Sequence, residues 1–140
     1  MRLVLDASAA VTVILNRPEA HRFKEALAAA DLVLAPDLLV PEIVNAIWKY
    51  HQFEGLGVDI CDRALSQALG IVDLLVPSKE LAREAFLLAR TTRRPAYDMF
   101  CLALARREDA SLLTRDAALR KEAHRQGVGV LPQLASTPSA

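Results

Sequence analysis

The sequence predicts an α/β fold with a small parallel sheet that carries helices on both faces. Short apolar runs alternate along the chain with longer segments of helical periodicity, and the helical segments make up more of the chain than the runs do. This alternation is typical of parallel sheets covered by helices. Hydrophobic residues also make up 53% of the 140 residues, which is enough to build the core of one domain.

Five apolar runs have the length of strands and are predicted to form the sheet. Strands that are buried on both faces are apolar along their whole length, and these runs have that character. In chain order they are Arg2–Leu5, Leu32–Ala35, Val72–Val76, Ser111–Thr114 and Val128–Leu131.

Helical periodicity fills the gaps between the runs in the first half of the chain. In the longest segment, apolar residues recur at helical spacing from Leu38 to Tyr50. A Gly-Leu-Gly sequence at 55–57 separates this segment from the next. The predicted helices are Ala7–Leu15, Glu19–Ala30, Asp37–Glu54 and Val58–Gly70.

Three further helices are predicted in the second half of the chain. Ser78 is expected to cap the first of them, because Glu80 and Leu81 follow it in the first turn. Gly127 is expected to stop the last one. The predicted ranges are Ser78–Arg90, Tyr97–Arg107 and Ala117–Gln126.

Composition predicts one cytoplasmic domain over residues 1–134 and a flexible tail over residues 135–140. Lys plus Arg and Asp plus Glu are balanced at 17 each, which argues against a protein that coats nucleic acid through its net charge. No apolar stretch approaches the roughly 20 residues of a membrane span, and the N-terminal run is too short for a signal peptide. The two cysteines form no Cys-x-x-Cys or Cys/His cluster, so a zinc site is not indicated.

Four acidic residues fall where a parallel sheet places its ligands. Asp6 directly follows the first predicted strand, and Asp116 comes two residues after the end of the fourth. Glu42 lies in the first turns of the long helix, and Asp98 opens a later one. Such sheets bind ligands at the carboxyl ends of their strands.

Carboxylates gathered at one edge raise one another's pKa unless a cation neutralises them. Mg²⁺ and Mn²⁺ prefer oxygen ligands and suit the cleavage of phosphodiester bonds. Helix capping is the alternative for the three aspartates, because Asp is favoured between a strand and a helix. Both interpretations stay open at this point.

The local sequences around the four acids are more specific than their spacing. In chain order they read Val4-Leu5-Asp6-Ala7-Ser8, Pro41-Glu42-Ile43-Val44-Asn45-Ala46, Tyr97-Asp98-Met99-Phe100-Cys101-Leu102-Ala103-Leu104-Ala105 and Leu113-Thr114-Arg115-Asp116. This set resembles the PIN-domain nucleases, and especially the VapC-like toxin ribonucleases of type II toxin–antitoxin systems. The resemblance extends from Arg2 to about Leu131.

The resemblance implies a three-layer α/β/α sandwich and a Mg²⁺- or Mn²⁺-dependent endoribonuclease that hydrolyses RNA. On the matching positions, Asp6, Glu42, Asp98 and Asp116 would be the catalytic acids. Asp6, Asp98 and Asp116 would hold the metal, and Glu42 would complete its shell or orient the attacking water.

Further residues would support the site or bind the substrate. Ser8 and Thr114 match polar positions that help to hold it, although each could equally be a hydroxyl of local structure. Asn45 lies one helical turn after Glu42 and would either bond to it or face solvent. Arg93, Arg94 and Arg115 would hold flanking phosphates. Some relatives carry a further acid or Asn after the fourth acid, where this chain has Ala117-Ala118-Leu119-Arg120, so a second metal would have fewer ligands.

The resemblance also implies a homodimer and a small antitoxin protein that covers the acidic site. The long helix carries Ile47, Trp48, Tyr50 and Phe53, which is more apolar surface than one buried stripe needs. These residues would form a groove for an antitoxin helix or a dimer face, or else be buried in the domain's own core. The alternative function is a catalytically silent PIN-like module that only binds a protein. A dinucleotide-binding enzyme is excluded, because no Gly-x-Gly-x-x-Gly follows the first strand.

Overall fold

The computed structural model describes residues 1–134, and the tail predicted at 135–140 lies outside the described residues. Within residues 1–134 every predicted element is present, with ends no more than two residues from those predicted. None of the helices there is long and apolar enough to cross a membrane. The strands are β1 (Arg2–Leu5), β2 (Leu32–Pro36), β3 (Leu74–Val76), β4 (Ser111–Leu113) and β5 (Val130–Leu131). The helices are α1 (Ala7–Ile14), α2 (Ala20–Ala29), α3 (Leu39–Glu54), α4 (Val58–Ile71), α5 (Ser78–Thr92), α6 (Ala96–Arg107) and α7 (Ala117–Arg125).

The strands form one parallel sheet in the order β3-β2-β1-β4-β5. The first strand is therefore the central one, and its carboxyl end lies between those of β2 and β4. Leu5 of β1 is paired with Leu113 of β4, and the Asp6 N–H donates to the Leu113 carbonyl at 3.2 Å. This register brings the residues that follow the two strands, Asp6 and Thr114, side by side.

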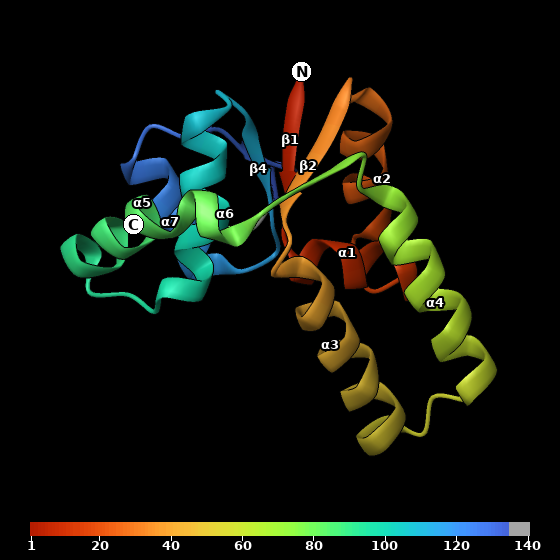
Figure 1. The fold of residues 1–140 in the computed structure, drawn as a ribbon. Coiled ribbons are helices and arrows are strands. Elements are labelled where there is room, and N and C mark those ends of the chain that lie inside the picture. Colours follow the sequence, from red (N-terminus) through yellow and green to blue (C-terminus); the bar gives the residue numbers. More distant parts are fainter. Residues whose placement is uncertain (135–140) are drawn as a thin grey trace.

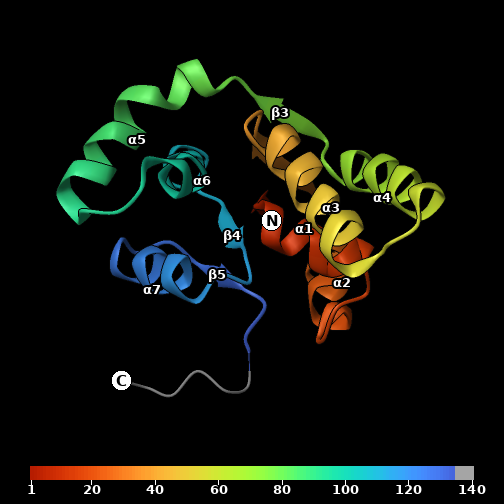
Figure 2. The ribbon, with the colours of Figure 1, turned by 90° about the horizontal axis from the view of Figure 1, so that it is seen from below.

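Helices cover both faces of the sheet, which confirms the predicted α/β/α sandwich (Figure 1). Alternate strand residues point to opposite faces, so each face has its own core. Val4, Leu34 and Leu112 pack with buried residues of α5, α6 and α7. Leu3 and Val33 pack with buried residues of α1, α2, α3 and α4. Seen from below, the two groups of helices lie on either side of the strands (Figure 2).

The start of α5 is fixed by a residue that lies far away in the sequence, just after β2. The prediction that Ser78 caps this helix was wrong: the N-cap residue is Pro77, and it makes no side-chain cap. Instead Asp37, which follows β2, accepts hydrogen bonds from the N–H and the hydroxyl of Ser78. The Asp37 N–H also donates to the Val76 carbonyl at 2.8 Å. The end of β2 is thereby tied to the end of β3 and to the start of α5.

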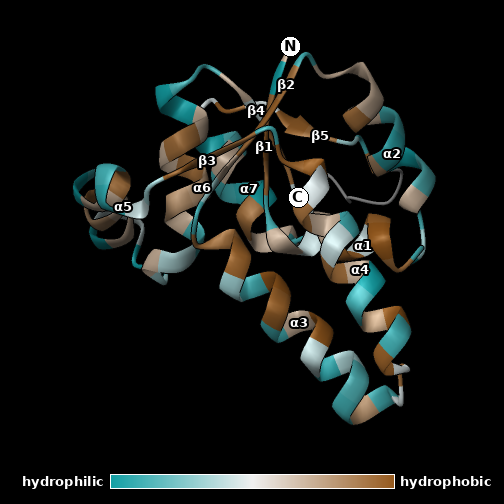
Figure 3. Ribbon diagram, turned by 45° about the vertical axis from the view of Figure 1, so that its right-hand side comes forward, coloured by the Kyte–Doolittle hydropathy of each residue, from teal (hydrophilic) through white to brown (hydrophobic). Residues whose placement is uncertain are grey.

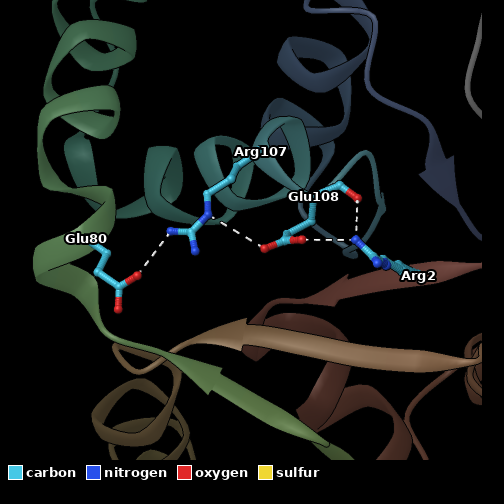
Figure 4. A network of polar contacts seen from close by, with 4 residues as sticks. All are labelled: Arg2, Glu80, Arg107 and Glu108. Carbon is cyan, nitrogen blue, oxygen red and sulfur yellow. Dashed lines mark hydrogen bonds and ion pairs between the residues drawn. The ribbon is translucent and has the colours of Figure 1, made fainter.

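At the amino end of β1, a chain of ion pairs connects three elements (Figure 4). Arg2 of β1 lies 3.0 Å from the Glu108 carboxylate, which lies 3.6 Å from Arg107 at the end of α6. Arg107 also lies 3.4 Å from Glu80 in the first turn of α5. Exposed ion pairs add at most about 1 kcal/mol each, so this network supports the helix arrangement only weakly. It lies at the amino end of β1, whereas Asp6 lies at the carboxyl end.

Candidate active site

Asp6 is the most firmly held of the predicted acids. It follows the central strand and is the N-cap of α1, where its Oδ1 accepts the Ala9 N–H at 3.0 Å. The same oxygen accepts the Ser8 hydroxyl at 2.7 Å, and Oδ2 accepts the Thr114 hydroxyl at 2.5 Å. Three donors therefore fix the orientation of one carboxylate.

The hydroxyls of Ser8 and Thr114 connect this carboxylate to the backbone of the neighbouring strand end. Each hydroxyl has one proton, and each gives it to Asp6. Their oxygens lie 3.2 Å apart, and each accepts a backbone N–H: Ser8 from Arg115 at 2.9 Å, and Thr114 from Asp116 at 3.1 Å. Because these backbone N–H groups can only donate, each hydroxyl oxygen accepts one of them, and the hydroxyl proton is then available for Asp6. This arrangement favours an ionised Asp6.

The other three acids are held less tightly. Asp116 is exposed and caps α7, with its Oδ1 accepting the Leu119 N–H at 2.9 Å. Asp98 and Glu42 are partly buried and lie in the first turns of α6 and α3, where neither is the N-cap. The capping alternative thus describes Asp6 and Asp116 correctly, but it does not account for Asp98.

The pKa values show that the four acids share one electrostatic environment. Protein atoms surround the Asp6 carboxylate, and this burial raises its pKa to about 6, against the hydrogen bonds described above and with the help of Asp116. Burial raises the pKa of Glu42 to about 7, and the charges of Asp6 and Asp98 add to the rise. Burial and the charge of Asp116 also raise the pKa of Asp98, against the charge of Arg94.

Cys101 is a neighbour of the acids that sequence reasoning missed. Burial raises the pKa of its thiol well above the ordinary value, and the charges of Asp6, Glu42 and Asp98 raise it further. The thiol is therefore protonated and places a neutral, buried group beside the carboxylates. Its position three residues after Asp98, one turn along α6, was the available signal.

The four acids have the carboxylate oxygens that a metal site needs, but their side chains do not converge on one point where a metal ion could bind. Among residues 1–134, no group of three or more His, Cys, Asp or Glu side chains is arranged to hold a metal ion. Their chemistry still fits a hard divalent cation, because the donors are carboxylate oxygens. Burial is the main cause of the raised pKa values of Asp6, Glu42 and Asp98, and the mutual repulsion of the acids, which adds to it, is the interaction that a cation would relieve.

The three predicted substrate-binding arginines have different surroundings. Arg93 is exposed and ends α5 with a left-handed backbone, at a φ of 58°. Arg94 lies close enough for its charge to lower the pKa of Asp98, and its buried Nε has no hydrogen-bond partner among residues 1–134. Arg115 donates from Nη1 to the Pro18 carbonyl at 2.6 Å. Arg94 is therefore the arginine with the clearest link to the acids.

Asn45 does not join the site. It is exposed on α3, and within residues 1–134 it makes no hydrogen bond to Glu42. Of the two alternatives left open for this residue, exposure to solvent is the one observed.

A groove between α3 and α4 exposes much of the apolar surface predicted on the long helix. In Figure 3 the two helices extend together from the body of the domain and carry hydrophobic segments. Ile47 is buried, whereas Trp48 is 50% exposed and Phe53 is 73% exposed, and the rings of these two aromatic residues meet edge to face. The groove has a volume of about 290 Å³ and is lined by Val44, Ile47, Trp48, His51, Val58, Cys61, Asp62 and Leu65.

Known proteins are similar to this chain in sequence and in fold. Residues 3–124 match the PIN domain family. Ribonuclease VapC3 of Pyrobaculum aerophilum is 27% identical over 124 residues, which cover 87% of this chain and 95% of the relative.

Solved structures with the same fold include PAE2754 from Pyrobaculum aerophilum, with a TM-score of 0.65 and 21% identity over 93% of this chain and 92% of that one. They also include VapBC2 from Rickettsia felis bound to a DNA fragment from its promoter, with a TM-score of 0.66 and 16% identity over 96% of this chain and all of that one. A third is VapC20 from Mycobacterium tuberculosis, a toxin that cleaves the sarcin–ricin loop, with a TM-score of 0.64 and 15% identity over 86% and 94% of the two chains.

Proposed function

The chain belongs to the PIN domain family, and from this premise we propose that it is a metal-dependent endoribonuclease and the toxin of a toxin–antitoxin pair. One observation carries the proposal: Asp6 is held ionised by Ser8 and Thr114 in an environment that it shares with Glu42, Asp98 and Asp116. A merely structural Asp6 would need only its cap to α1. The hydroxyl bonds from the neighbouring strand end go beyond that need. The similarity to Ribonuclease VapC3 supports RNA as the substrate.

Asp6, Asp98 and Asp116 would hold the cation, Mg²⁺ or Mn²⁺. When bound, it supplies positive charge for the phosphate oxygens and for the charge that builds up as the phosphodiester bond breaks. Asp6 is already oriented, and Asp116 is fixed by its cap to α7. Asp98 is free of capping and can adjust its position.

Glu42 is proposed as the proton acceptor for the attacking water. Its pKa of about 7 lies close to neutral pH, where a general base works best. Within residues 1–134 its side chain makes no hydrogen bond, so its oxygens are available to water. A proton taken up by Glu42 would also reduce the repulsion that Asp6 and Asp98 impose on it.

Arginines near the acids would bind the RNA backbone. Arg94 is proposed to contact the phosphate next to the cleaved bond, because its charge already acts on Asp98. Arg93 and Arg115 would hold flanking phosphates. Phosphate contacts of this kind position a nucleic acid without reading its sequence.

Two separate apolar surfaces are available for two protein partners. The groove between α3 and α4 is proposed to receive an apolar helix of the antitoxin. A second surface on α5 exposes Phe86 and Leu87, which are 56% and 51% exposed, between Arg83 and Arg90. We propose that this second surface takes part in homodimer formation.

The alternative is a catalytically silent module that uses only these surfaces. The lack of a closed metal cluster among residues 1–134 favours it, whereas the hydrogen bonds that keep Asp6 ionised favour the enzyme. The two differ in affinity for Mn²⁺, which only the enzyme would bind through Asp6.

Cleavage of RNA and binding of Mn²⁺ by the same variants test the proposal. The unaltered chain should cleave single-stranded RNA in Mg²⁺ or Mn²⁺, and Asp6→Asn should lose both cleavage and calorimetric Mn²⁺ binding while keeping its fold. Asp59→Asn, which changes an exposed acid on α4, is the matched control and should retain both. Cleavage by purified Asp6→Asn at the unaltered rate would exclude the assigned site.

A further inference from the structure

Arg120 makes an unusual set of contacts close to the candidate site. It lies on α7, one turn after Asp116, and is partly buried. Its Nη1 donates to the Thr114 carbonyl at 2.8 Å and to the Leu131 carbonyl at 3.3 Å, and its Nη2 donates to the Pro132 carbonyl. Within residues 1–134 it forms no ion pair. One guanidinium thus binds three backbone carbonyls.

These three carbonyls lie where the sheet ends. Thr114 follows β4, Leu131 is the last residue of β5, and Leu113 and Leu131 are paired in the register of the two strands. Beyond this pair the strands no longer bond to each other, so their last carbonyls need other donors. A planar guanidinium can reach several of them at once, whereas a lysine ammonium lacks this fork.

The Thr114 carbonyl belongs to the same peptide group as the Arg115 N–H. A peptide group is planar and rigid, so holding its oxygen also sets the direction of its N–H. The Arg115 N–H donates to the Ser8 hydroxyl oxygen, and the Ser8 hydroxyl donates to Asp6. A continuous path of contacts therefore runs from the guanidinium of Arg120 to the Asp6 carboxylate.

We propose that Arg120 is a positioning residue of the nuclease site, which orients the peptide between Thr114 and Arg115 so that its N–H holds the Ser8 hydroxyl in place to donate to Asp6. Arg120 acts through this peptide and does not touch the RNA. The inference rests on the proposed function. The family resemblance indicated the four acids, and Arg120 is a further residue outside that set.

The test compares Arg120→Met, Arg120→Lys and the control Lys121→Ala. The Met variant keeps an unbranched apolar side chain, and the Lys variant keeps the charge without the fork. Lys121 is exposed on the same helix and makes no contact with these carbonyls, so its variant removes one positive charge only. Thermal unfolding of each variant establishes that the fold is intact, and Arg120→Lys serves if Arg120→Met does not fold.

The first measurement needs neither metal nor RNA. Hydrogen exchange of individual amides, followed by NMR, should be about 10- to 100-fold faster at Arg115 in Arg120→Met, which is the usual effect of losing a hydrogen bond to a charged group. Exchange at Leu112, inside β4, should change much less. Lys121→Ala should exchange like the unaltered chain at both amides.

The second measurement is RNA cleavage. Arg120→Met should lower kcat by about 10- to 100-fold with KM within about twofold, and added guanidinium ion should restore part of the rate. Arg120→Lys should fall between Arg120→Met and the unaltered chain. A rise in KM alone, or an equal loss in Lys121→Ala, would assign Arg120 to RNA binding and overturn the inference.

The two measurements separate this inference from the proposed function. Unchanged exchange at Arg115 in a folded Arg120 variant overturns the positioning role even if the chain cuts RNA. Failure of the unaltered chain to cut RNA counts against the proposed function, and the exchange experiment still decides whether Arg120 orients the bonds to Asp6.

Discussion

The hydroxyl of Thr114 donates a 2.5 Å hydrogen bond to the carboxylate of Asp6, although the two residues lie 108 positions apart in the chain. The parallel register of β1 and β4 brings them together, because Leu5 and Leu113 are partners in that register. Thr114 has no exposed surface, so its hydroxyl makes this bond away from solvent. It therefore links the packing of the sheet directly to the chemistry of the site.

Replacing Thr114 by Val should impair the site with little change in packing volume. The variant removes one donor to Asp6 and leaves the Asp116 N–H without its acceptor. A hydrogen bond to a charged group is worth about 1.5–3 kcal/mol, so RNA cleavage should fall by at least about tenfold. Thr114→Ser keeps the hydroxyl and should retain most of the activity. Equal activity of the Val and Ser variants would contradict the role of this bond.

Mn²⁺ binding should weaken steeply as the pH falls from 7.5 to 5.5. The pKa values of Asp6 and Glu42 are raised to about 6 and about 7. In this range protons therefore compete with the cation for the Asp6 oxygens, and protonated Glu42 no longer adds its negative charge to the site. Carboxylates with ordinary pKa values near 4 would stay ionised throughout and give a flat profile. Calorimetric titration with Mn²⁺ at pH 5.5, 6.5 and 7.5 measures the difference, and constant affinity down to pH 5.5 would be inconsistent with it.

Glu42→Gln should stabilise the metal-free protein at alkaline pH. The pKa of Glu42 is higher in the folded chain than in the unfolded chain, so its contribution to stability is present below about pH 4.5 and is lost as the pH rises through 7. The amide avoids this loss, and the free energy of unfolding at pH 8 should rise by about 1–2 kcal/mol after allowance for solvent screening. Urea unfolding at pH 8 and pH 4.5 tests this expectation. A gain of the same size at both pH values would assign it to a cause other than ionisation.

Trp48 offers a direct report on the proposed antitoxin groove. It is half exposed on α3 and is the single tryptophan of the chain, so its fluorescence arises from the groove alone. Binding of an antitoxin helix should shift its emission to shorter wavelength, and Trp48→Ala should weaken binding by about 2 kcal/mol or more, as for a buried aromatic anchor. Phe86→Ala on α5 is the control. If this control weakens antitoxin binding as much as Trp48→Ala does, the groove assignment is wrong.

Asp37→Ala should lower stability without altering the chemistry of the site. It removes the acceptor for both hydrogen bonds from Ser78 and leaves the start of α5 uncapped, which costs about 1 kcal/mol. The midpoint of thermal unfolding should therefore fall by a few degrees. Cleavage of RNA below that midpoint should match that of the unaltered chain. An unchanged midpoint would mean that water replaces the carboxylate at no cost.

The fold could be predicted from the sequence because its signals are local. Apolar runs and helical periodicity depend on neighbours within a few residues, and every predicted element is present in the described chain. The strand ends then place Asp6 and Thr114 at one edge, since β1 and β4 are neighbouring strands of a parallel sheet. The cap of α5 was assigned wrongly because its acceptor, Asp37, lies 41 residues before Ser78 and only the packing of β2 beside β3 brings it there.

The parts of the site that could not be predicted depend on long side chains and on burial. The sequence around Arg120 gives no sign of its contacts, because its carbonyl partners at Leu131 and Pro132 are defined only when β5 is in place. Cys101 belongs to the core, and its proximity to Asp6 and Glu42 follows from how α6 packs against the sheet. That the four acids are catalytic stays a prediction.

Asp6 and Asp116 each start a helix as well as belonging to the acidic quartet, whereas Glu42 and Asp98 cap nothing. A homologue that no longer cuts RNA would still be selected to keep both capping aspartates, because losing either one costs stability. The same selection would favour loss of Glu42, whose ionised form opposes folding. Genome surveys that separate degenerate homologues from working toxins should therefore examine positions 42 and 98 rather than 6 and 116.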